Sequence, residues 1–146
     1  TDEQGRTLQE IEPPAARQPV SAAAARQVRQ MLVQVVEKGT AKMARSDFYE
    51  VGGKTGTANK LNAARTDYDD NRQVVSFLGY MSAGDGPRIA GIVIVDEPRL
   101  AEHLNYGGRL AAPLFRRIAE RAMAYYNVPA LFAVNEPTAR TAAGKK

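Results

Sequence analysis

One segment of the sequence places residues that can do chemistry at a short spacing. Gly52-Gly53-Lys54-Thr55-Gly56-Thr57 sets a cation beside two hydroxyls, among glycines that leave room for a ligand. A phosphate-binding loop would need a glycine five residues before Gly53, where Phe48 stands. The residues that follow favour a strand and then a loop, so no helix N-terminus is expected to face a phosphate. The segment therefore argues against a nucleotide site.

The Lys-Thr-Gly core of this segment fits another chemistry, the edge strand of a serine acyl-transfer site. Lys54 and Thr55 can hold a substrate carboxylate through charge and hydrogen bonding together. Gly56 removes a side chain, so that an extended substrate can lie against the strand. Thr57 can present a backbone N–H and a hydroxyl to the same cleft. A tripeptide such as Lys-Thr-Gly also occurs by chance. The motif alone is equally compatible with a surface turn that carries a solvated lysine.

Five segments, in order, resemble the C-terminal part of class B penicillin-binding proteins, the cell-wall transpeptidases of the FtsI and PBP2 type. They are Ala25–Leu32, Gly53–Ala58, Val75–Tyr80, Val93–Pro98 and Tyr106–Phe115. The resemblance implies a peptidoglycan D,D-transpeptidase that cross-links stem peptides through a serine acyl-enzyme and binds β-lactams. It implies the α+β fold of the penicillin-binding and β-lactamase-like enzymes, with three antiparallel strands of the sheet and helices in this chain. No cofactor and no metal are expected.

The resemblance gives each residue of the motif a role. Lys54 and Thr57 are implied as catalytic residues: Lys54 through electrostatics and hydrogen bonds to the other motifs, and Thr57 through a backbone N–H in the oxyanion hole. Thr55, Gly56 and Thr57 are implied as substrate-binding residues. The two hydroxyls take the carboxylate of the substrate or β-lactam, and Gly56 keeps the strand open.

Two motifs of that family are absent from the chain. The nucleophile and its base need Ser-x-x-Lys, and proton transfer needs Ser-x-Asn; none of the four serines, Ser21, Ser46, Ser76 and Ser82, starts either pattern. Thr57 and Lys60 have the first spacing, but inside the strand motif. Both motifs precede Lys-Thr-Gly in the family, so we expect the N-terminal part of the domain as a partner and the chain alone to be inactive.

Other classes stay open at this point. A non-catalytic homologue that binds peptidoglycan or a division partner is the main alternative, and a penicillin-responsive sensor or β-lactamase relative is a third. The resemblance implies the bacterial periplasmic or extracytoplasmic face and cell-wall synthesis proteins as partners. It also implies that an N-terminal segment outside this chain anchors the complete protein to the cytoplasmic membrane.

Composition excludes several mechanisms. The 146 residues suit one domain, and the absence of cysteine excludes disulfides, thiolate zinc sites and a cysteine nucleophile. The single histidine, His103, excludes a multi-histidine metal cluster and is expected in a loop. The net charge of +4 depends partly on Arg140, Lys145 and Lys146, and no basic cluster is interleaved with aromatics, so nucleic acid is not an expected partner. No segment resembles a signal peptide or a membrane span.

The elements that must position the motif follow from periodicity and turn residues. Apolar residues at helical spacing predict a helix over 21–38, with Ser21 as its N-cap and Gly39 as a left-handed C-terminal cap. A second amphipathic pattern predicts a helix over 110–127. Strands are expected over 49–60, 74–81 and 89–95, with an exposed loop over 61–72 and a tight turn over 83–87 that makes the last two strands a hairpin.

Domain boundaries follow from the same pattern. Residues 1–20 are predicted to be an extended lead-in, 21–128 the C-terminal part of the transpeptidase domain, and 129–146 a flexible tail. The nearly continuous apolar run over 89–95 predicts a strand that is covered on both faces.

Overall fold

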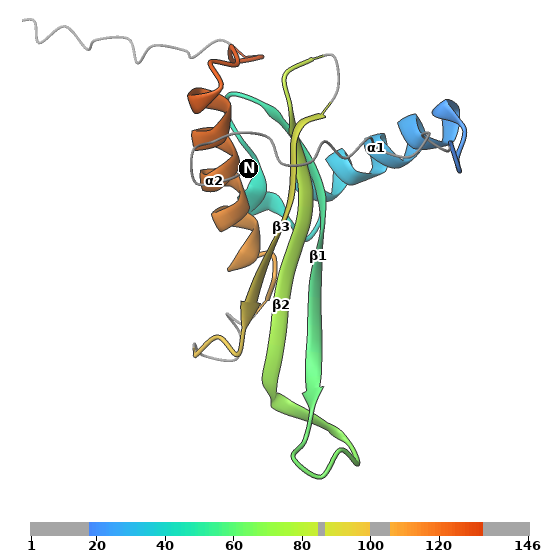
Figure 1. The fold of residues 1–146 in the computed structure, drawn as a ribbon, viewed down its shortest axis with the longest axis vertical. Helices are drawn as coiled ribbons and strands as arrows, with labels where there is room; N and C mark the ends of the chain where they lie inside the picture. The colour runs from blue at the N-terminus through green and yellow to red at the C-terminus, as the bar shows by residue number, and fades with distance from the viewer. Residues whose placement is uncertain (1–17, 85–86, 100–105, 133–146) are drawn as a thin grey trace, which may run out of the picture.

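The computed structural model describes residues 18–84, 87–99 and 106–132 of the chain. In this part, helices and a three-stranded antiparallel sheet in the order β1-β2-β3 form an α+β arrangement, as predicted (Figure 1). The elements are α1 (Ala22–Glu37), the short 3-10 helix η1 (Lys42–Ala44), β1 (Glu50–Leu61), β2 (Tyr68–Ser82), β3 (Pro87–Asp96) and α2 (Ala111–Tyr125). No helix among these residues is long and apolar enough to cross a membrane.

The first helix begins where it was predicted but ends differently. The Ser21 hydroxyl accepts the backbone N–H of Ala24 at 3.1 Å, which confirms the N-cap. Gly39 does not adopt the left-handed conformation, so that prediction is wrong, and Lys38 forms the cap with φ −125°. Glycine is needed at position 39 for space, because a Cβ there would lie 2.8 Å from the carbonyl oxygen of Val35.

The hairpin of β1 and β2 is longer than predicted. Residues 68–72, expected in an exposed loop, belong to β2, and Leu61 pairs with Tyr68 beyond an irregularity at Asn59 and Lys60. Ion pairs across the sheet stabilise this polar end: Lys60 lies 2.6 Å from Asp96 and 3.0 Å from Glu97, and Arg72 lies 2.7 Å from Glu97. The prediction was wrong because a charged segment forms a strand when its charges are paired across strands.

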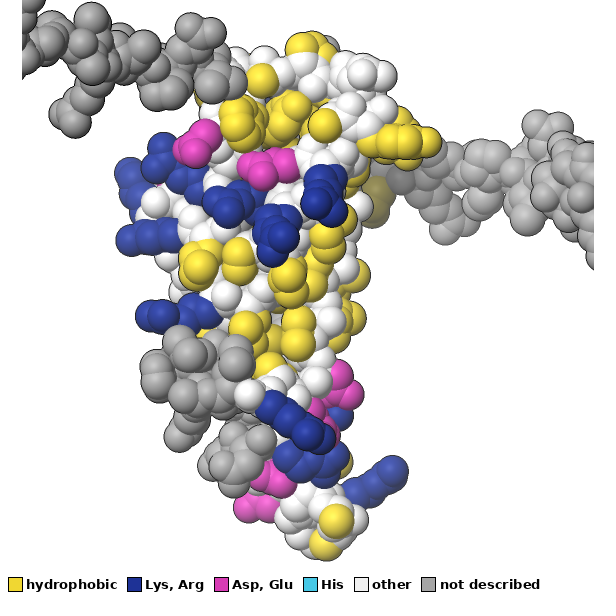
Figure 2. All heavy atoms as spheres, turned by 90° about the vertical axis from the view of Figure 1, so that its left-hand side faces the viewer, with side chains coloured by type: hydrophobic (Ala, Val, Ile, Leu, Met, Phe, Trp, Pro, Cys, Tyr) yellow, Lys and Arg dark blue, Asp and Glu magenta, His cyan; other side chains and the backbone are white. Residues whose placement is uncertain are grey.

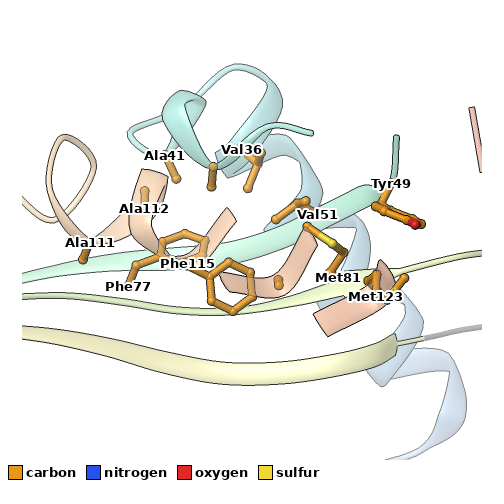
Figure 3. Close-up of a cluster of buried hydrophobic side chains, with 12 residues drawn as sticks. Val36, Ala41, Tyr49, Val51, Phe77, Met81, Ala111, Ala112, Phe115 and Met123 are labelled. Atoms are coloured by element: carbon orange, nitrogen blue, oxygen red, sulfur yellow. The ribbon is translucent and has the colours of Figure 1, made fainter. Parts of the chain in front are cut away.

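One face of the sheet carries the core. Phe77, Met81 and Val51 point from β1 and β2 towards α2, whose Phe115 lies 5.1 Å from Phe77 between ring centroids (Figure 3). Met123 of α2 is fully buried in the same cluster. The end of α1 and the turn after it complete the cluster with Val36, Ala41 and Ala44. This packing holds the motif strand against both helices.

In the part of the chain that the structure describes, α1 covers the other face of the sheet only at one end, where Tyr80 and Ser82 are buried, and the rest of this face is bare. Cross-strand pairing places Lys54, Leu78 and Ile92 side by side on this face. Leu78, Ile92 and Ile94 are 59%, 56% and 59% exposed, whereas the alternate residues Ile89 and Val93 pack against the core. The prediction that both faces of residues 89–95 are covered is therefore wrong for the described residues.

Helix α2 lies along one side of the molecule with its outer surface exposed. In Figure 2, which shows that side, Lys and Arg side chains gather beside apolar ones. Ile118 is 60% exposed there, and Arg117 and Arg121 line the same shallow hollow. The predicted helix over 110–127 is thus confirmed within two residues at either end.

The predicted boundaries fall near the limits of the described residues. Most of the lead-in over 1–20, all but four residues of the tail over 129–146, part of the turn over 83–87, and His103 lie outside them. Leu131 and Phe132 are described, and their backbone N–H groups donate to the carbonyl of Phe48 at 2.9 and 3.2 Å. Leu131 and Phe132 are therefore attached to the segment that precedes β1.

Candidate functional site

The Lys-Thr-Gly motif lies in the middle of β1, which is an edge strand of the sheet in the described part of the chain. An edge strand exposes backbone N–H and C=O groups that can bind an extended peptide as an added strand. The position of the motif therefore allows the substrate geometry that the sequence suggests.

The glycines of this segment are explained first by packing inside the chain. A Cβ at position 52 would lie 2.5 Å from the ring of Tyr80, and one at position 53 would lie 2.3 Å from Phe77. At Gly56 a Cβ would lie 2.5 Å from the hydroxyl of Ser76. The space beside these glycines is thus occupied by side chains of β2, so their presence alone does not indicate a ligand.

The motif side chains alternate between the two faces of the sheet. Lys54 and Gly56 pair with Leu78 and Ser76 on the bare face, whereas Thr55 and Thr57 pair with Phe77 and Val75, which are buried. Lys54 is exposed, and its Nζ donates to the carbonyl of Thr55 at 2.9 Å. No carboxylate pairs with Lys54 among the described residues. The lysine is accordingly available to an external group.

A cavity of about 650 Å³ brings three of the four predicted residues together. It is lined by Lys54, Thr55 and Thr57 of β1, by Gly39, Thr40, Lys42 and Met43 after α1, and by Tyr106, Gly107, Gly108 and Arg109 before α2. Gly56 is not part of the lining. This volume is in the range of small-ligand pockets.

The lining of this cavity is cationic. Lys42, Lys54 and Arg109 contribute positive charge, the threonines contribute hydroxyls, and no lining residue is acidic. Cations that converge on a concave surface raise the local concentration of anions. The cavity therefore suits a ligand with a carboxylate.

Three segments that are distant in the sequence meet at this cavity. Gly107 lies so close to the sheet that a Cβ there would be 2.3 Å from the carbonyl oxygen of Ser76 in β2 and 2.7 Å from that of Gly56 in β1. A Cβ at Gly108 would be 2.0 Å from the carbonyl oxygen of Thr40. The hydroxyls of Thr40 and Thr55 are 2.9 Å apart. The two glycines thus lock the turn after α1 and the segment before α2 onto the motif strand.

The sequence did not indicate Thr40, Lys42, Met43 or Arg109 as site residues, and Tyr106–Phe115 entered only as a segment that resembles the family. The only local signals were the Gly39-Thr40 step at the end of a helix and the glycine pair. Neither signal indicates what the segment packs against, so only the tertiary contacts place these residues at the cavity.

A second polar cluster attaches α1 to the sheet. Arg29 Nη2 donates to Glu50 Oε1 at 2.6 Å and to Ser82 Oγ at 2.9 Å, and its guanidinium lies 5.6 Å from the centre of the Tyr80 ring. The hydrogen bond that Arg29 donates to Glu50 is the main reason why the pKa of Arg29 is raised. Burial raises the pKa of Tyr80, and its hydrogen bonding with Arg29 lowers this pKa by a smaller amount. The cluster fixes the helix that precedes Thr40.

The chain belongs to the penicillin-binding proteins. The family described as penicillin binding protein transpeptidase domain matches residues 3–120. The chain is 38% identical over 106 residues to a protein of Neisseria flavescens named probable peptidoglycan D,D-transpeptidase PenA. That match covers 72% of this chain and 25% of the relative.

Solved structures agree with the family. The transpeptidase domain of penicillin-binding protein 3 from Burkholderia pseudomallei superposes with a TM-score of 0.71 at 34% identity, covering 87% of this chain and 37% of that one. Penicillin-binding protein 3 from Mycobacterium tuberculosis, solved with ampicillin, gives a TM-score of 0.64 at 36% identity. This match covers 81% of this chain and 27% of that one. The chain thus has the fold of these domains and spans only a fraction of their length.

Proposed function

We propose that this chain is the C-terminal portion of a peptidoglycan D,D-transpeptidase that cross-links stem peptides through a serine acyl-enzyme and binds β-lactams at the extracytoplasmic face. The observation that carries the proposal is the cation-lined cavity beside the edge strand Lys54-Thr55-Gly56-Thr57. The named activity of the PenA relative and the ampicillin complex of the Mycobacterium tuberculosis protein support the substrate class.

In the proposed reaction the nucleophile comes from the N-terminal part of the domain. A serine hydroxyl attacks the carbonyl of the penultimate D-alanine, and the terminal D-alanine leaves with the proton. An acceptor amine then attacks the ester, which returns a proton to the serine and completes the cross-link. With a β-lactam, the amine released from the cleaved amide stays tethered to the acyl group, and the serine again forms an ester.

This chain supplies the wall that holds the substrate during both steps. The charge of Lys54 stabilises the site electrostatically, and the hydroxyls of Thr55 and Thr57 bind the terminal carboxylate. The backbone N–H of Thr57 donates to the oxyanion of the tetrahedral intermediate. Gly56 keeps the edge of the strand accessible to the peptide.

We expect the N-terminal part of the domain to pack on the bare part of the sheet face opposite the core. Lys54 shares that face with the exposed side chains of Leu78 and Ile92. A part of the domain that covers these apolar side chains would carry its serine to the ammonium group of Lys54. The proposal thus accounts for both the exposed apolar surface and the absence of a carboxylate partner for Lys54 among the described residues.

The first prediction tests the role of Lys54. In the chain rejoined to the N-terminal part of its domain, Lys54→Ala should reduce the second-order rate of acylation by a fluorescent penicillin at least about 100-fold, because an electrostatic group of the site is lost. Lys38→Ala removes an exposed lysine from the end of α1 and should have no effect.

The same assay on the 146 residues alone should give no covalent adduct, and such an adduct would contradict the assignment of the nucleophile to the N-terminal part. An unchanged rate for Lys54→Ala would refute the proposed role. Binding of peptidoglycan by the rejoined protein without any acylation would favour the non-catalytic homologue instead.

A further inference from the structure

The cavity contains a threonine pair that the proposed roles do not use fully. Thr40 Oγ1 and Thr55 Oγ1 are 2.9 Å apart, a normal distance between two hydroxyls that share one hydrogen. Thr55 lies in the motif, and Thr40 lies in the turn between α1 and η1. The pair joins the motif strand to a segment that precedes it by fifteen residues.

The position of Thr40 is tightly determined by its surroundings. The backbone N–H groups of Gly39 and Ala41 donate to the carbonyl of Val35 at 3.1 and 3.2 Å, which ties the turn to the end of α1. On its other side the carbonyl of Thr40 fits against Gly108, where any Cβ would overlap it. The backbone of Thr40 is therefore held in place on both sides, and its hydroxyl lies 2.9 Å from that of Thr55.

A count of hydrogens gives this arrangement a chemical meaning. A threonine hydroxyl has one hydrogen to donate and two lone pairs that accept. Thr55 can bind a carboxylate only by donating its hydrogen, so it must accept in its bond with Thr40 when the carboxylate is present. Thr40 is then the donor, and the two bonds polarise each other in the same direction.

We propose that Thr40 is a positioning residue that donates to Thr55 and so directs the Thr55 hydroxyl hydrogen at the substrate carboxylate. This inference rests on the proposed function, since it assumes a ligand with a carboxylate in the cavity. Thr40 acts through Thr55. The three cations of the lining attract the carboxylate, and the threonine pair orients the group that receives it.

The test compares two substitutions at Thr40 in the chain rejoined to the N-terminal part of its domain. Thr40→Val keeps the shape of the side chain and removes the hydroxyl, whereas Thr40→Ser keeps the hydroxyl. Each variant is assayed with benzylpenicillin and with its methyl ester, which lacks the carboxylate. Thr66→Val, which removes a threonine hydroxyl from the tip of the β1–β2 hairpin, is the matched control.

We expect Thr40→Val to weaken the binding step of acylation by benzylpenicillin about fivefold, the effect of one lost hydrogen bond, with little change in the chemical step. The methyl ester should react with Thr40→Val at the rate of the unsubstituted protein. Thr40→Ser and Thr66→Val should behave like the unsubstituted protein with both compounds.

Two results would overturn the inference. If Thr40→Val weakens binding of benzylpenicillin and of its methyl ester equally, Thr40 has a structural role. If Thr40→Val does not weaken binding of benzylpenicillin, Thr55 needs no hydrogen-bond donor. Neither result touches the proposed function, which fails separately if the rejoined protein is not acylated or if Lys54→Ala leaves acylation unchanged.

Discussion

At the scale of single residues, small side chains at crossing points shape the cavity. Gly107 and Gly108 allow the segment before α2 to contact the backbones of β1, β2 and the turn after α1. Gly91 in β3 differs, because a Cβ there would meet only the ring of Phe115 at an ordinary 3.8 Å. A methyl group is therefore expected to disturb the packing at Gly107 and Gly108 much more than at Gly91.

A prediction at this scale compares two glycines. In the complete transpeptidase domain, Gly108→Ala should lower the free energy of unfolding by about 1–3 kcal/mol, because the new Cβ must displace the backbone of Thr40. Gly91→Ala should change it by less than about 0.5 kcal/mol. Thermal and denaturant unfolding would measure both variants, and equal effects would contradict the packing described here.

At the scale of the elements, the long hairpin depends on a group of charges at its base. Glu97 accepts from Lys60 Nζ at 3.0 Å and from Arg72 Nη2 at 2.7 Å. The hydrogen bond from Lys60, followed by that from Arg72, holds the pKa of Glu97 below its ordinary value. The irregularity at Asn59 and Lys60 lies at the same place, so the hairpin beyond it is joined to β3 mainly through these ion pairs.

The pH dependence of this hairpin follows from the lowered pKa. The Glu97 carboxylate stabilises the hairpin at neutral pH, above the pKa of the unfolded chain, and this contribution is lost as the pH falls through the folded-state pKa. Amide hydrogen exchange over 61–68, corrected for intrinsic rates, should show this loss below about pH 4.5, the ordinary value for glutamate.

Glu97→Gln is the matching variant for this prediction. It should weaken protection of the same amides at neutral pH and abolish the acid-induced change that depends on Glu97. Glu37→Gln, which affects the exposed ion pair between Glu37 and Arg45, serves as the control. A hairpin whose protection changes equally in both variants would show that the Glu97 cluster does not hold it.

At the scale of the whole molecule, the described residues form one layered piece whose sheet is covered by α2 on one face and by α1 only at one end of the other face. The core side carries Phe77 and Met81 under α2, and the bare side carries Leu78 and Ile92. Exposed apolar patches of this kind mark surfaces that bind another part of a protein. The chain spans 25% of the PenA relative and 37% of the Burkholderia pseudomallei domain.

Two isoleucines of similar exposure test this assignment. Ile92 on the bare face and Ile118 on α2 are 56% and 60% exposed in this chain. In the complete transpeptidase domain, Ile92→Thr should lower the free energy of unfolding by about 1–2 kcal/mol because the side chain becomes buried, whereas Ile118→Thr should change it by less than about 0.5 kcal/mol. Chemical unfolding of both variants measures the difference, and equal values would place the missing part elsewhere.

The sequence by itself determined the features that neighbouring residues encode. Helical spacing and the Ser21 cap predicted α1 closely, and β-branched runs predicted the centres of the strands. Five segments, among them Gly53–Ala58, together indicated the family. Local propensity and short motifs depend on residues close in the chain, so these signals are visible without the fold.

Only the tertiary structure decided which residues share the cavity and which face of the sheet is bare. Thr40 and Gly108 meet at the motif strand through backbone contacts between segments far apart in the sequence, and no local pattern specifies such contacts. Residues 68–72 were expected in a loop, but the structure places them in β2, where Arg72 pairs with Glu97. The physical reason is that packing and charge pairing depend on the distance between atoms in space, which residue order alone does not determine.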